Sequence, residues 1–148
     1  MPTSSKEVPA AAKEAWSHFW RIFLEDKPRR MAIITELGLS FQQSMALMRL
    51  EPGVPTPMSA LATAMQCDNS NVTGIVDRLE AAGLAERRAA EHDRRVKAVA
   101  LTEKGERIRL EVERRIGQPP PALAALSDED AIALRDILRR AAATLDAP

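Results

Sequence analysis

The sequence predicts a mainly α-helical fold with one small β-wing. Three observations support this prediction. Apolar residues recur at helical spacing over most of the chain, the stretch between residues 84 and 101 alternates instead, and turn-forming residues separate these segments. The most informative stretch is residues 68–105, which reads as a helix, a tight turn and a two-stranded ribbon with a charged tip.

The first part of this stretch is a helix predicted over residues 69–82. Asp68 suits the N-cap because its carboxylate can accept the free amides of the first turn, and Gly83 stands where a left-handed residue commonly ends a helix. One face is apolar: Val72, Ile75, Val76 and Leu79. The other face is small or polar and is followed by Arg78, which suits the base edges of a DNA major groove: Asn69, Ser70, Asn71, Thr73, Gly74 and Asp77.

The ribbon follows, with strands expected over residues 84–88 and 96–101. Residues 87–97 hold five basic and two acidic side chains, a local charge of +3: Arg87, Arg88, Arg94, Arg95 and Lys97 against Glu91 and Asp93. A basic tip beside a polar helix indicates contact with phosphates and with a minor groove. Arg87 and Arg88 are open to either reading, as phosphate contacts or as solvated strand residues.

A second short helix precedes the polar one. We expect Met58 to form a short edge strand and Ser59 to cap this helix, whose apolar residues face inward. The turn at residues 66–68 then joins the two helices into a helix-turn-helix. Cys67 lies in this turn, where we expect a small buried residue. The alternative is an oxidant-sensing thiol, which the neighbouring Asp68 disfavours.

This order of elements resembles the winged helix-turn-helix of MarR-type bacterial transcription regulators. The resemblance rests on Leu79-Glu80-x-x-Gly83-Leu84, on Asp93-x-Arg95, and on Leu101-Thr102-x-x-Gly105. It implies that the helix 69–82 reads DNA and that Arg95 enters the minor groove, with Asp93 orienting it through a charge-assisted bond. It also implies phosphate contacts from Arg78, Arg94 and Lys97.

Amphipathic helices flank this core. Trp16, Phe19, Trp20 and Phe23 form one stripe, and a C-terminal helix starting after Ser127 carries another apolar stripe. Leaving such stripes in water is unfavourable, so we expect a homodimer that presents two recognition helices to a pseudo-palindromic site. The expected organisation is a flexible tail at 1–9, helical dimerisation regions at 10–38 and 103–148, and a winged DNA-binding domain at 39–102.

The resemblance also implies a small aromatic or anionic effector that binds beside the dimer helices and releases DNA. Candidate walls for its pocket are Trp16, Phe19, Trp20, Phe41 and Met45. The same aromatic stripe is open to a simpler reading, as a helix-packing or dimer surface.

Composition excludes several other classes. The 148 residues have a formal net charge of zero, which argues against a binder that relies on bulk charge. With one cysteine, two distant histidines and no phosphate-loop or metal-spaced motif, we expect no enzyme, no metal and no cofactor. The absence of a long apolar run or signal-like start favours a cytoplasmic protein. A winged module that binds only proteins is the alternative to a DNA-binding regulator.

Overall fold

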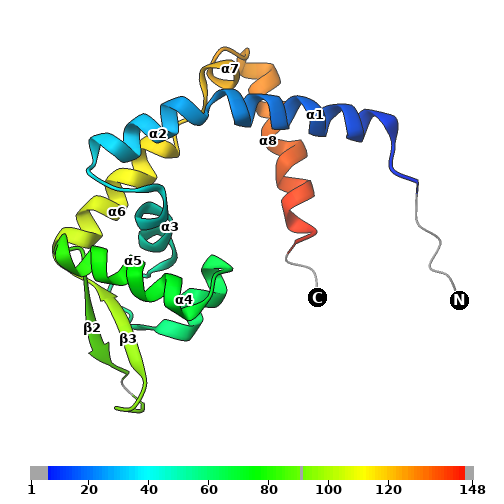
Figure 1. Cartoon of the computed structure of the whole chain (residues 1–148). Helices are drawn as coiled ribbons and strands as arrows, with labels where there is room; N and C mark the ends of the chain where they lie inside the picture. Colours follow the sequence, from blue (N-terminus) through cyan, green and yellow to red (C-terminus); the bar gives the residue numbers. More distant parts are fainter. Residues whose placement is uncertain (1–6, 91, 146–148) are drawn as a thin grey trace, which may run out of the picture. The chain divides into compact units, whose positions relative to one another are not determined.

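The computed structural model describes residues 7–90 and 92–145, and its chain divides into two compact units (Figure 1). One unit is Pro28–Gln118, and the other joins Met1–Lys27 to Pro119–Pro148. Most of the expected flexible tail, the tip residue Glu91 and the last three residues of the expected C-terminal dimerisation region lie outside the described residues. The predicted mainly α fold with a small β-wing is confirmed.

The unit Pro28–Gln118 holds five helices and three strands among the described residues. In chain order they are α2 (Lys27–Glu36), α3 (Phe41–Arg49), β1 (Thr56–Pro57), α4 (Met58–Met65), α5 (Asn69–Ala81), β2 (Ala85–Ala89), β3 (Lys97–Leu101) and α6 (Glu103–Ile116). The strands form one antiparallel sheet in the order β1-β3-β2, with Thr56 opposite Val99 and Val99 opposite Arg87. The ribbon β2–β3 is therefore the wing (Figure 1).

The core of this unit draws apolar side chains from every helix and from β3. Ile34 of α2, Leu47 of α3, Leu61 of α4 and Val112 of α6 are almost fully buried in one cluster. The apolar face of α5 lies in the same cluster. Because these elements share one core, the helix-turn-helix and the root of the wing hold a fixed geometry relative to each other.

Local signals in the sequence set most helix starts. Ser40 caps α3 in a full capping box with Gln43, and Thr102 caps α6 through the Gly105 amide at 3.0 Å. Two expectations were wrong: the edge strand is Thr56–Pro57, and Met58 already begins α4, so Ser59 lies inside the first helical turn. The reason is tertiary, since pairing of Thr56 and Pro57 with β3 fixes where the chain must turn.

The end of α5 is fastened to the start of α6. The Thr102 hydroxyl donates to the Gly83 carbonyl at 2.6 Å, and the Lys104 ammonium donates to the Ala82 carbonyl at 2.9 Å. Gly83 has the left-handed φ of +71° that this turn needs. Gly105 lets α6 approach so closely that an added Cβ would lie 1.8 Å from the Leu84 carbonyl oxygen.

The other unit consists of α1 (Ala10–Glu25), α7 (Pro121–Ala124) and α8 (Asp128–Ala143). None of these helices has a buried residue in the described chain. The four rings of α1 stack along one face, with Trp16 and Phe19 centroids 5.4 Å apart, yet they stay 43–62% exposed. Ile132, Ile137 and Leu138 of α8 are likewise about half exposed. No helix in the described part of the chain is both long and apolar enough to cross a membrane.

Two glycine substitutions should change the free energy of unfolding in opposite directions. Gly105→Ala forces a methyl group against the Leu84 backbone, so we expect a loss of about 1–3 kcal/mol or more. Gly74→Ala in α5 meets open space, so we expect a gain of about 1 kcal/mol from helix propensity. Urea unfolding of both variants measures this, and destabilisation by Gly74→Ala would contradict the assignment of open space there.

Candidate nucleic-acid interface

Helix α5 begins with a side-chain cap that also organises its first turn. The Asp68 carboxylate accepts the Asn71 amide at 2.9 Å and the Ser70 hydroxyl at 2.7 Å. These bonds, first from Asn71 and then from Ser70, hold the pKa of Asp68 below its ordinary value. The start of α5 is therefore well defined although it lies at the surface.

The polar face of α5 points away from the core. Among the residues predicted to face DNA, Asn69, Ser70, Asn71, Thr73 and Arg78 are exposed. The Thr73 hydroxyl donates to the Asn69 carbonyl at 2.8 Å, so it and the Ser70 hydroxyl offer mainly acceptor lone pairs to a partner. Gly74 is half-buried, and a Cβ added at this position would meet no atom within 4 Å. A partner could therefore approach its backbone closely.

The wing tip is a compact turn that displays cations. The Asp93 carboxylate accepts the backbone amide of Arg95 at 2.9 Å, and the Asp93 carbonyl accepts the Val96 amide at 3.0 Å. Asp93 therefore shapes the backbone of the turn that carries Arg95, and its role in orienting the Arg95 side chain toward DNA stays a prediction. Within the described residues, the Arg94 and Arg95 side chains are exposed and have no ion-pair partner.

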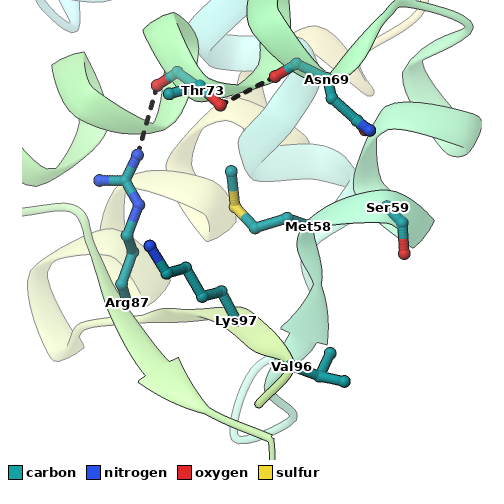
Figure 2. Close-up of a pocket in the computed structure, with 7 residues that line it drawn as sticks. All are labelled: Met58, Ser59, Asn69, Thr73, Arg87, Val96 and Lys97. Carbon is teal, nitrogen blue, oxygen red and sulfur yellow. Dashed lines mark hydrogen bonds between the residues drawn. The ribbon is translucent and has the colours of Figure 1, made fainter.

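An open groove of about 620 Å³ lies between α5 and the wing (Figure 2). Its lining comes from both elements and from the start of α4: Met58, Ser59, Asn69, Thr73, Arg87, Val96 and Lys97. The exposed Lys97 side chain reaches into this groove from β3, and it makes no ion pair with any described residue. Three of the predicted DNA-binding residues, Asn69, Thr73 and Lys97, therefore share one concave surface.

Arg87 and Arg88 differ, although the sequence left both open. Arg87 lies between two acidic residues of α5: its guanidinium pairs with Glu80 and donates to Asp77 at 2.7 Å. Partial burial lowers the pKa of Arg87, but the bonds and charges of these carboxylates outweigh it and raise the pKa overall. Arg88 pairs with Glu86 on its own strand and is exposed. No local pattern of residues indicates the Arg87 cluster, because it depends on the position of β2 beside α5.

The predicted effector residues belong to both units. Trp16, Phe19 and Trp20 stack on α1, whereas Phe41 and Met45 lie on α3, exposed and half-buried respectively. Cys67 is a free, half-buried residue that packs against the core of the winged unit. The pocket and the role of this thiol stay predictions.

A helix-turn-helix followed by an antiparallel ribbon with a cationic tip defines a winged helix-turn-helix protein. Residues 39–97 match the model of the MarR family. The HTH-type transcriptional regulator YfiV of Bacillus subtilis is 31% identical over 96 residues, which is 65% of this chain and 60% of that protein. The match thus spans less than two thirds of YfiV.

Solved structures extend the similarity over nearly the whole chain. A MarR family protein from Bacillus stearothermophilus is 29% identical with a TM-score of 0.78, covering 96% of this chain and 100% of that one. YusO from Bacillus subtilis is 25% identical with a TM-score of 0.73, covering 93% and 98%. The match to the MarR family model thus covers residues 39–97, and the similarity of fold to solved structures extends beyond it over most of the chain.

The lowered pKa of Asp68 predicts a specific pH dependence of stability. A carboxylate whose pKa is lower in the folded state stabilises the fold above its unfolded pKa, about 3.9, and loses this effect as pH falls through the folded value. Asp68→Asn keeps a capping oxygen but cannot titrate. The stability of the wild type relative to this variant should therefore fall between about pH 5 and pH 2 in urea titrations. A difference that stays constant over this range would contradict the capped-carboxylate account.

Proposed function

We propose that this protein is a cytoplasmic transcriptional regulator that binds double-stranded DNA sequence-specifically and acts as a repressor. The observation that carries the proposal is the groove shared by the polar face of α5 and the wing, with Lys97 and the tip arginines unpaired in the described chain. Unpaired cations next to small donors and acceptors match the two requirements of DNA recognition, phosphate contact and base reading.

In this proposal α5 lies in the major groove with its N-terminal half against the bases. Asn69, Asn71 and the backbone at the half-buried Gly74 read base edges there, while Ser70 and Thr73 accept from them. Arg95 at the wing tip enters the adjacent minor groove, and Arg78, Arg94 and Lys97 contact phosphates. A mutant of MepR from S. aureus, 21% identical and similar in fold with a TM-score of 0.64, was solved bound to an oligodeoxyribonucleotide.

We further propose that the chain is a homodimer, with contacts from residues 10–38 and 103–148. Support comes from the apolar faces of α1 and α8, which are about half exposed within a single chain. Each large apolar side chain buried against a second copy would contribute about 1.5–3 kcal/mol. A two-fold dimer presents two copies of α5 to successive major grooves of a pseudo-palindromic operator.

We also propose that a small aromatic or anionic effector binds this protein and that its binding releases the DNA. Its support is limited to the exposed rings of α1, because apolar and aromatic side chains commonly line small-molecule sites. A panel of aromatic acids should lower the affinity of the protein for its selected DNA. If no member changes this affinity or the melting temperature, an aromatic-acid effector is excluded for that panel.

The test of the central proposal starts with selection of binding sequences from a randomised duplex pool at near-physiological salt. Arg95→Ala should then weaken binding to the selected duplex by on the order of tenfold or more, because it removes a minor-groove cation. Arg88→Ala is the matched control, since Arg88 is already paired with Glu86 and should change affinity little. Failure of the wild type to select any sequence would contradict the proposal and favour a winged module that binds proteins.

Charge placed in the aromatic stripe should separate the proposed dimer. Trp20→Glu buries an unpaired carboxylate at the interface, so sedimentation analysis should give a monomer at micromolar concentration. Arg21→Glu introduces the same side chain on the opposite face of α1 and should leave the dimer intact. A dimer that survives Trp20→Glu would place the contact elsewhere.

A further inference from the structure

The environment of Arg87 has a consequence for how DNA is bound. Its guanidinium contacts three groups on one face of α5: the Thr73 carbonyl at 3.5 Å, the Asp77 carboxylate at 2.7 Å and the Glu80 carboxylate. The Arg87 backbone amide also donates to Glu80 at 2.8 Å. One residue of the wing strand β2 is thus tied to two turns of α5.

These bonds also set the charge beside the groove. Asp77 and Glu80 place two carboxylates on the helix that is proposed to approach DNA, and Asp77 is 61% exposed. Without a cation between them, both would repel the phosphates of a bound duplex. Arg87 neutralises this site from within the protein, and its side chain is only 25% exposed.

Lys97 provides a contrast in the same groove. Figure 2 shows both side chains on the wing side of the groove, with Arg87 bonded to Thr73 and Lys97 making no drawn bond. A cation that is already shared by two carboxylates must give up those bonds to take a phosphate, whereas Lys97 gives up only water. The two cations should therefore contribute to binding in different ways.

The following inference rests on the proposed DNA-binding function. We propose that Arg87 is a positioning residue, which holds the wing against α5 and cancels the charge of Asp77 and Glu80, while Lys97 is the phosphate ligand of this groove. Arg87 contributes through the carboxylates that it binds, and Lys97 contributes through the DNA.

The test compares four variants on the selected duplex over a range of salt concentrations: Lys97→Gln, Arg87→Gln, Arg88→Gln, and a triple variant that combines Arg87→Gln with Asp77→Asn and Glu80→Gln. Loss of one phosphate contact lowers the slope of log affinity against log salt by about 1. Lys97→Gln should show this lower slope. Arg87→Gln should weaken binding by on the order of tenfold with an unchanged slope. Arg88→Gln should behave like the wild type.

The triple variant decides whether Arg87 acts through the carboxylates of Asp77 and Glu80 or binds a phosphate of the DNA. Removal of both carboxylates should restore most of the affinity lost in Arg87→Gln, because no uncompensated negative charge then remains on α5. Thermal melting of each variant without DNA identifies a general loss of folding. If Arg87→Gln alone is unstable, the affinity and the salt slope of the triple variant still test the role of Arg87.

Two results would overturn the inference and are distinguishable from failure of the proposed function. A slope lowered by about 1 in Arg87→Gln, with no recovery in the triple variant, would make Arg87 a phosphate ligand. Equal affinity of Arg87→Gln, Arg88→Gln and the wild type would show that the Arg87 contacts do not matter for binding. In both cases the wild type still binds its duplex, whereas a wild type that binds no DNA would end the proposed function itself.

Discussion

The burial of one face of α5 is the constraint on which the interface depends. Val72, Ile75, Val76 and Leu79 are all at most 3% exposed in the core of the winged unit. Each contributes about 1.5–3 kcal/mol, so turning the helix to hide its polar face would cost several times that amount. The core therefore holds Asn69, Asn71 and Gly74 at the surface, where a partner can reach them.

The same core fixes what surrounds α5. Bonds from Thr102 and Lys104 fasten its C-terminal end to α6, and the close approach at Gly105 leaves no room for adjustment there. On the other side Arg87 ties α5 to the wing strand β2. Helix α5, the wing and the start of α6 thus behave as one element, which means that any shift of α6 must also move the DNA-binding surface.

Much of this arrangement follows from local signals that can be read in the sequence. The caps at Ser40, Asp68 and Thr102 each need only a side chain and an amide three residues later, and the apolar spacing of α5 defines its buried face. Met58 and Ser59 were misassigned because sheet pairing of Thr56 and Pro57, a long-range effect, sets the start of α4. The left-handed Gln66 at the end of α4 was also not foreseen, since nothing in its residue type requires it.

The site residues likewise divide into those indicated by local sequence and those whose role depends on tertiary structure. Exposure of the α5 face and of the wing-tip arginines could be anticipated, but the distinct roles of Arg87 and Lys97 depend on which strand lies beside which helix.

The most direct test of the central claim is a chemical footprint of the protein on its selected duplex. The account predicts protection of guanine N7 in two major grooves one helical turn apart, with minor-groove protection by the wings on either side. Weak protection spread evenly along the duplex would contradict it.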